Sequence, residues 1–186
     1  GQGYIQTTPI QLCLMTAQIA NGGYSITPKI LVNKDLPSND LAQSMKEQNL
    51  FTANVQLFKD VKNIKIIQEA MFSSTNEPRG TSYGSRIDDP KYQFAGKTGT
   101  AQVKRISKRE RELDLDTNQI PYKDRDHALY VAYGPYKNPK YALSIVIEHG
   151  GSGSKAAAPI AKKLFQLIID RDELRQKQPK FLKIDI

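Results

Sequence analysis

The stretch Ala95-Gly96-Lys97-Thr98-Gly99-Thr100-Ala101-Gln102-Val103 gathers small residues and hydroxyl groups around one lysine. It follows Tyr92 and Phe94, which alternate with their neighbours at the two-residue period of a strand with one buried face. Gly99 has no Cβ to obstruct a backbone that pairs with an extended ligand. We therefore expect a strand that carries Lys97 and along which a peptide can bind.

The hydroxyl and ammonium groups of this strand suit the recognition of a carboxylate. Thr98 and Thr100 have one residue between them, so their side chains should point to the same side of the strand. Both can donate to a terminal carboxylate while Lys97 supplies positive charge, and a charge-assisted hydrogen bond contributes about 1.5–3 kcal/mol. The predicted substrate-binding residues are therefore Lys97, Thr98, Gly99 and Thr100.

A phosphate-binding loop is a rival interpretation of the same letters. Gly96-Lys97-Thr98 would close such a loop only if a glycine stood five residues before Gly96. That position holds Lys91, so this interpretation fails.

The composition is typical of one globular domain, with 186 residues, of which 39% are hydrophobic and 25% charged. We find no apolar run of transmembrane length and no signal sequence at the N-terminus. The net charge of +8 comes from scattered residues rather than from a basic stripe, which argues against nucleic-acid binding. The single Cys13 excludes an intramolecular disulfide, and its place on an apolar helical stripe favours an inert thiol.

Hydrophobic periodicity and turn residues predict a domain over residues 1–175 and a tail over 176–186. The first helix has Thr8 as its N-cap and a proline in its first turn. The charged stretch from Lys104 to Asp126 is predicted to be a loop beside the candidate site. The predicted helices span 8–21, 54–72 and 156–170, and the predicted strands, expected to form an antiparallel sheet, lie near 92–103, 127–133 and 141–149.

A second class of enzyme is suggested by Gly151-x-Gly153-x-x-Ala156, which follows a predicted strand and precedes a predicted helix. This spacing fits the fingerprint of a dinucleotide-binding fold. That fold needs a second parallel strand with an acid about 20 residues further on. Asp170 and Asp172 stand instead at a helix end, so a nucleotide-binding enzyme remains only as an alternative.

Two further motifs match the residue patterns that accompany a catalytic serine in serine acyltransferases. Ser152-x-x-Lys155 lies in a glycine-rich loop after the Lys97 strand, and Ser74-x-Asn76 is expected in a turn after the second helix. A nucleophile of this kind should begin a buried helix earlier in the chain. Both motifs are therefore interpreted as coincidences.

The two histidines are interpreted as structural or surface residues. His127 follows Asp126, and His149 follows Glu148. Neighbouring residues on a strand point to opposite faces, so neither pair can form one catalytic site through its strand.

Several stretches, in order along nearly the whole chain, resemble one family. They are Gly1-Gln2-Gly3-Tyr4 with Thr8-Pro9-x-Gln11, the run Phe94 to Val103, Arg125-Asp126-His127-Ala128 through Gly134-Pro135, and Val146-x-Glu148-His149-Gly150-Gly151. Lys-Thr-Gly is one of the three sequence marks of penicillin-recognising serine acyltransferases. The chain is similar to the C-terminal part of a class B penicillin-binding protein transpeptidase domain, of the penicillin-binding protein 2 (cell-elongation) type.

The resemblance implies an α+β fold of the serine β-lactamase-like type, in which helices flank an antiparallel sheet and the Lys97 strand edges a cleft. It implies a serine-type D,D-transpeptidase that cross-links peptidoglycan stem peptides and is acylated by β-lactam antibiotics. Lys97, Thr98 and Thr100 would bind the carboxylate of either ligand. The backbone N–H of Thr100 would form half of an oxyanion hole, and no cofactor or metal is implied.

The resemblance also implies that the acylated serine, its lysine and the Ser-x-Asn element lie upstream of Gly1. The 186 residues alone are then expected to be inactive, although the parent protein is an enzyme. That protein would act at the periplasmic face of the bacterial inner membrane, anchored by a segment absent from this sequence, with cell-elongation proteins as possible partners. The alternative is a degenerate copy that has lost the serine and keeps a non-catalytic peptide-binding groove.

Overall fold

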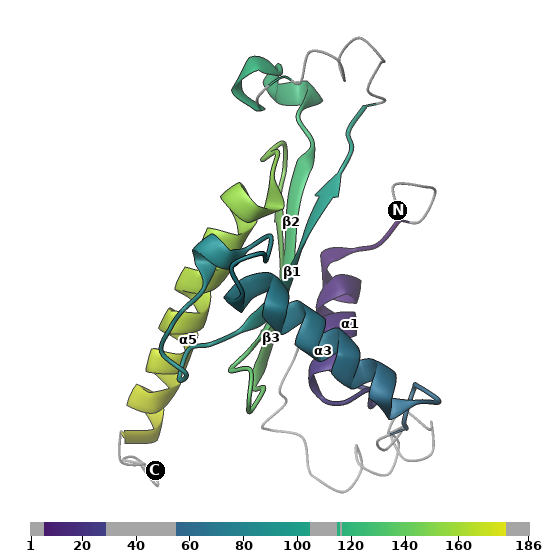
Figure 1. The fold of residues 1–186 in the computed structure, drawn as a ribbon, viewed down its shortest axis with the longest axis vertical. Helices are drawn as coiled ribbons and strands as arrows, with labels where there is room; N and C mark the ends of the chain where they lie inside the picture. The colour runs from purple at the N-terminus through teal and green to yellow at the C-terminus, as the bar shows by residue number, and fades with distance from the viewer. Residues whose placement is uncertain (1–5, 29–54, 105–114, 116, 178–186) are drawn as a thin grey trace, which may run out of the picture.

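The computed structural model describes residues 6–28, 55–104, 115 and 117–177. Figure 1 shows a central sheet with α5 on one side and the pair α1 and α3 on the other. The strands are β1 (Ala95–Ala101), β2 (His127–Gly134) and β3 (Tyr141–Ile147). Helices flank an antiparallel sheet, so the predicted α+β fold is confirmed.

All pairings in this sheet are antiparallel, and the strand order is β1-β2-β3. Lys97 pairs with Val131, and Thr98 pairs with Tyr130. Among the described residues β1 therefore has a neighbouring strand on one side only. The strand that carries Lys97 forms an edge of the sheet.

Helix α1 (Pro9–Ala20) forms because the signals for its start and end are local. The Thr8 side chain accepts a hydrogen bond from the backbone N–H of Gln11, and the Gln11 side chain accepts one from the Thr8 N–H, which completes a capping box. Gly22 and Gly23 end the helix with φ values of 89° and 93°, which favour glycine. On this helix the Cys13 thiol donates to the Ala142 carbonyl, and burial raises its pKa, as befits an inert thiol.

Helix α3 (Val61–Asn76) begins later than the predicted span of 54–72. The carboxylate of Asp60 accepts from the backbone N–H of Lys62 at 2.9 Å and caps the helix there. Before it, Gln56 forms an isolated bridge with Tyr24. The apolar residues of 55–60 follow helical spacing by chance, and the capping aspartate decides the start.

Helix α5 (Ala158–Lys177) follows a π-helical turn over Gly153–Ala157 and continues past the predicted end at residue 170. Its extra turns carry Glu173, whose carboxylate accepts from the Lys91 ammonium at 2.9 Å. This contact with the segment before β1 stabilises the last turns of α5, whose residues are polar and show no apolar periodicity. The predicted boundary at 175/176 therefore falls inside α5, while 178–186 lie outside the described residues.

The predicted loop between Lys104 and Asp126 contains two short 3-10 helices, η2 (Thr117–Gln119) and η3 (Tyr122–Asp124). Residues 105–114 and 116 of that loop lie outside the described residues. A third 3-10 helix, η1 (Tyr83–Ser85), lies between α3 and β1. In the described parts of the chain, none of the helices has the length and apolar character needed to cross a membrane.

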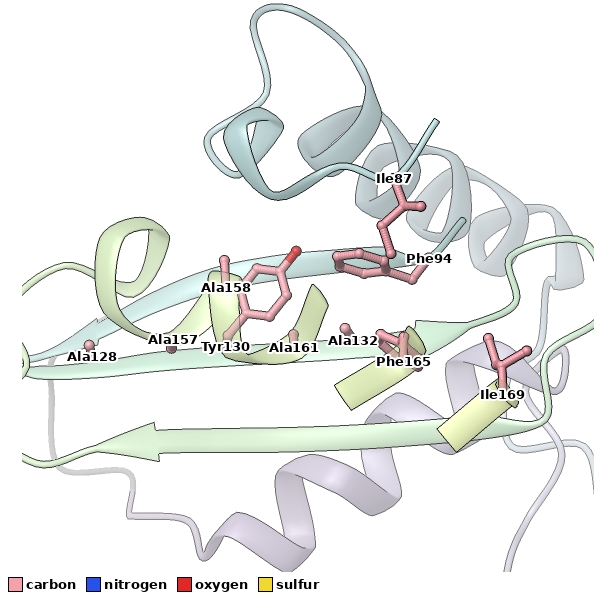
Figure 2. Close-up of a cluster of buried hydrophobic side chains, with 10 residues drawn as sticks. All are labelled: Ile87, Phe94, Ala128, Tyr130, Ala132, Ala157, Ala158, Ala161, Phe165 and Ile169. Atoms are coloured by element: carbon pink, nitrogen blue, oxygen red, sulfur yellow. The ribbon is translucent and has the colours of Figure 1, made fainter. Parts of the chain in front are cut away.

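The main core lies between α5 and the sheet, as Figure 2 shows. Phe94 stacks on Phe165 with ring centroids 4.9 Å apart, and both are fully buried. Burial of each ring contributes about 1.5–3 kcal/mol. Small side chains at Ala132 and Ala161 let α5 approach the sheet closely. A second, smaller cluster on the opposite face joins α1 and α3 to β2.

The contact between α5 and the segment before β1 should make stability depend on acidic pH. The Tyr92 hydroxyl donates to the Asp170 carboxylate, and this bond, followed by the Lys91 ammonium, holds the pKa of Asp170 below its ordinary value. A lowered folded pKa contributes stability above the unfolded pKa of about 4, and this contribution is lost as the pH falls through the folded value. Below about pH 7 the free energy of unfolding should decrease as the pH falls, and we call this part of the curve the acid limb. Tyr92→Phe should make this decrease smaller, as measured by urea unfolding from about pH 7 to about pH 2.

Tyr24→Phe is the matched control, because the Tyr24 side chain is exposed. This variant should keep the acid limb of the wild-type protein. An unchanged acid limb in Tyr92→Phe would show that the bond from Tyr92 to Asp170 does not stabilise the contact between α5 and the segment before β1.

Candidate functional site

The Lys97 side chain contacts its neighbour Thr98 at the outer edge of β1. Its ammonium nitrogen donates to the Thr98 carbonyl oxygen at 2.9 Å and to Thr98 Oγ1 at 3.4 Å. Alternation along the strand puts the two Cβ atoms on opposite faces, so the lysine stem bends round the edge to make these bonds. The structure therefore brings Lys97 and Thr98 together, and exposed Thr100 lies two residues further along the face of Thr98.

The peptide groups at the edge follow the same alternation. The Thr98 carbonyl accepts from Lys97 and thus points away from β2. The N–H and C=O of one strand residue point to the same side, and this side repeats every two residues. The peptide N–H of Thr100 should therefore also face outward, where a ligand can approach.

Thr98 is also in contact with Thr81, in the turn between α3 and η1. The Oγ1 atoms of these two threonines lie 3.1 Å apart and share a hydrogen bond. Ser74 Oγ lies 3.2 Å from Thr81 Oγ1 on its other side. A chain of three hydroxyl groups thus runs from the end of α3 to the edge of β1.

The prediction that Ser74 and Asn76 lie in a turn after the second helix is wrong, because both occupy the last turn of α3. The Asn76 side chain donates to the carbonyls of Phe72 and Phe94, at 3.0 Å and 2.9 Å. Asn76 thus fastens α3 to the chain just before β1. The Ser-x-Asn spacing has a structural role here.

A cleft of about 610 Å³ opens beside Lys97 on the face covered by α1 and α3. Its walls are mainly apolar, and its polar lining comes from the last turn of α3, the turn after it and Lys97. Arg79 and Lys97 bring positive charge to it, and Glu77 brings negative charge. The apolar wall consists of Met15, Ile19, Ile67, Ala70, Met71 and Val131.

Behind the edge lies a buried cluster of hydroxyl groups. Tyr130 OH is 3.0 Å from both Thr75 Oγ1 and Ser82 Oγ, and these two lie 3.3 Å from each other. All three side chains are nearly or fully buried. Burial raises the pKa of Tyr130, with smaller opposing effects from its two hydroxyl partners. The phenol therefore stays neutral and serves as a fixed hydrogen-bonding group.

The glycine-rich segment before α5 does not form a dinucleotide site. The preceding strand β3 pairs antiparallel with β2, whereas the fingerprint belongs to a parallel β-α-β unit. A side chain at Gly153 would collide with the Leu129 and Gly99 carbonyls, so this glycine permits close packing over the sheet. The dinucleotide interpretation is therefore wrong, and Ser152 Oγ bonds to Ser154 Oγ at 2.9 Å.

The side chains of His127 and His149 are in contact, which the alternation of side chains along each strand does not predict. The backbone N–H of His149 donates to His127 Nδ1 at 2.9 Å, and the ring centroids lie 4.8 Å apart. His149 Nδ1 also lies 3.0 Å from the Arg125 carbonyl oxygen. These contacts join the start of β2 to the end of β3. Among the described residues, no group of three or more His, Cys, Asp and Glu side chains could hold a metal ion.

Sequence reasoning missed the contributions of Thr81, Ser74 and Arg79 to this region. The sequence alone assigns no role to Arg79-Gly80-Thr81. The one available signal is Gly80, where a side chain would collide with the carbonyls of Ser73 and Ser74. Gly80, just after α3, indicates that the chain packs closely on the helix there. It does not indicate that Thr81 contacts β1.

Comparison with known proteins places the chain in one family. Residues 1–166 match the family model described as the penicillin binding protein transpeptidase domain. A curated relative, peptidoglycan D,D-transpeptidase MrdA of Salmonella typhimurium, is 33% identical over 178 residues, which are 91% of this chain and 26% of the relative. The chain thus spans about a quarter of the length of such relatives.

The fold is similar to solved structures of penicillin-binding proteins, in agreement with the sequence relatives. The structure of penicillin-binding protein PBP2 from Helicobacter pylori in complex with MreC matches with a TM-score of 0.61 and 30% identity, over 90% of this chain and 26% of that chain. Pseudomonas aeruginosa PBP2 in complex with WCK 5153 matches with a TM-score of 0.61 and 31% identity, over 90% of this chain and 32% of that chain.

The buried hydroxyl cluster should contribute measurably to stability. Tyr130→Phe removes one partner from Thr75 and one from Ser82, each of which keeps a backbone carbonyl partner, and the loss of a hydrogen bond of this kind costs about 0.5–1.5 kcal/mol. We expect the free energy of unfolding to fall by about this amount in urea titrations. Tyr122→Phe, at a side chain that is 63% exposed, should leave it nearly unchanged. Equal stabilities of the two variants would contradict a structural role for the cluster.

Proposed function

Because the chain belongs to the family of penicillin-binding protein transpeptidase domains, we propose that the edge of β1 binds the terminal carboxylate of a peptidoglycan stem peptide in a D,D-transpeptidase. The observation that carries the proposal is the convergence of Lys97 Nζ and Thr98 Oγ1 on this edge, beside the cleft. An ammonium group and a hydroxyl side by side provide charge and direction for one carboxylate. Thr100 extends the same face and contributes a further hydroxyl.

The proposed reaction is acyl transfer. A serine supplied by residues outside this chain attacks the carbonyl carbon of the penultimate D-Ala, and the terminal D-Ala leaves as the amine. An amine of a neighbouring stem peptide then attacks the acyl-enzyme, forms the cross-link and releases the serine. At both steps the outward peptide N–H of Thr100 stabilises the oxyanion, a role in which one lost donor typically costs about 2.7–4 kcal/mol.

The same edge accounts for the proposed inhibition by β-lactams. These antibiotics carry a carboxylate next to a strained amide and so resemble the end of the stem peptide. Gly99 has no side chain to stand along the strand, and a Cβ built there would come within 3.3 Å of Leu129 Cβ, a tight contact. An extended ligand can therefore lie against the backbone of β1.

The proposed partners and location follow from this substrate. Peptidoglycan lies outside the inner membrane, so we place the reaction at its periplasmic face. Cell-elongation proteins are proposed partners, in line with the Helicobacter pylori PBP2 structure that was solved with MreC. The curated relatives carry the same functional name, peptidoglycan D,D-transpeptidase.

Labelling with a fluorescent penicillin tests the proposal. The full-length protein should form a covalent adduct that survives denaturation, and prior treatment with unlabelled penicillin should prevent it. Residues 1–186 alone should stay unlabelled, because the nucleophile is supplied elsewhere. A full-length protein that resists labelling would contradict the transpeptidase proposal and favour a degenerate peptide-binding module.

Removal of the Lys97 charge should weaken the reaction with carboxylate ligands. Lys97→Met keeps an unbranched side chain of similar bulk but removes the ammonium group, whose bond to a carboxylate is worth about 1.5–3 kcal/mol. The second-order rate constant of penicillin labelling should fall about 10- to 150-fold. Lys140→Met, at an exposed lysine between β2 and β3, should label at the wild-type rate. Wild-type labelling of Lys97→Met would contradict carboxylate binding at this edge.

A further inference from the structure

Thr81, which lies outside the strand, shares a hydrogen bond with the Thr98 hydroxyl. A hydroxyl group has one proton and two acceptor lone pairs. Within the described part of the chain, Thr98 Oγ1 has two hydrogen-bonding neighbours, the Lys97 ammonium at 3.4 Å and Thr81 Oγ1 at 3.1 Å. The ammonium can only donate, so it takes one lone pair of Thr98.

The role of the second neighbour depends on Ser74. Thr81 Oγ1 lies 3.2 Å from Ser74 Oγ, so Thr81 can accept a proton from Ser74 and donate its own to Thr98. Both lone pairs of Thr98 are then occupied, and its proton points to neither partner. That proton is then available to a third acceptor, the carboxylate proposed to bind at this edge.

The opposite direction of donation is also consistent with these distances, since Thr98 can donate to Thr81 and Thr81 to Ser74. An incoming carboxylate accepts but cannot donate, so it favours the arrangement in which Thr98 donates to the ligand. In this arrangement each hydroxyl polarises the next one, which strengthens the final bond.

The turn that carries Thr81 is firmly attached to α3. The Ser82 N–H donates to the Ser74 carbonyl at 3.0 Å, and Ser82 Oγ belongs to the buried cluster around Tyr130. Gly80 packs directly against the carbonyls at the end of α3, where a side chain would not fit. Thr81 is therefore held at a fixed distance from β1 even though its own side chain is exposed.

We infer that Thr81 is a positioning residue for carboxylate recognition, acting through Thr98 with Ser74 behind it. The inference rests on the proposed function of the β1 edge and adds a specificity-determining group outside the Lys-Thr-Gly strand. Thr81 acts on the ligand only by orienting and polarising the Thr98 hydroxyl. Its loss should therefore weaken the first, noncovalent complex with a penicillin and leave the acylation step unchanged.

The experiment measures penicillin labelling of the full-length protein over a range of penicillin concentrations, which separates the dissociation constant of the first complex from the acylation rate constant. Thr81→Val removes the hydroxyl at nearly constant volume and should raise the dissociation constant about 3- to 10-fold. Thr81→Ser should restore it. Ser74→Ala should have a smaller effect in the same direction. Thr27→Val, at an exposed threonine in the segment after α1, should have no effect.

A double-mutant cycle separates positioning from general damage. In a Thr98→Val background, Thr81→Val should cause no further loss, because the group on which it acts is gone. The same loss in both backgrounds, or wild-type affinity in Thr81→Val, would overturn the inference while the transpeptidase proposal stands. Failure of the wild-type protein to label would instead overturn the proposed function and this inference with it.

Discussion

The buried hydroxyl of Tyr130 is the interaction on which the geometry of the site depends. It lies 3.0 Å from Thr75 on α3 and 3.0 Å from Ser82 in the turn that follows. Its position requires Gly96, because a side chain there would occupy the space of the phenol. Hydrogen bonds in such a dry region are strong when complete and costly when broken. One phenol thus fixes β2, β1 and the end of α3 relative to one another.

The candidate site is a consequence of this fixed arrangement. With α3 held beside β1, Thr81 lies within hydrogen-bonding distance of both Ser74 and Thr98. The cleft beside Lys97 then has one wall from the sheet and another from the two helices. Residues that touch no ligand therefore decide where the ligand-facing hydroxyl stands, and the site is more than the strand that carries its motif.

The parts of the fold that could be predicted from the sequence are those with local causes. Thr8 and the glycines after Ala20 define α1 by capping alone, and the alternation around Lys97 defines β1. The start of α3 was missed because apolar residues before Asp60 continue the helical spacing. The end of α5 was missed because a distant contact with Lys91 stabilises its polar turns.

The same distinction explains which part of the candidate site was predictable. Lys97, Thr98 and Thr100 form a recognisable motif because they are neighbours on one strand. Thr81 is 17 residues from Thr98 in the sequence, and their contact arises only when Gly80 packs on α3. A periodic pattern carries no information about such a pairing.

Lys97 and Thr98 make different contributions to the recognition of a carboxylate. The lysine has a flexible stem and three donors, two of which are used on the carbonyl and hydroxyl of Thr98. One donor and the full charge remain for an anion, but the flexible stem gives little angular selectivity. The threonine is β-branched and stiff at χ1, so its hydroxyl has a defined position, although it carries no charge. Since each supplies what the other lacks, selective binding of a chain-terminal carboxylate depends on their contact and on whatever orients the hydroxyl.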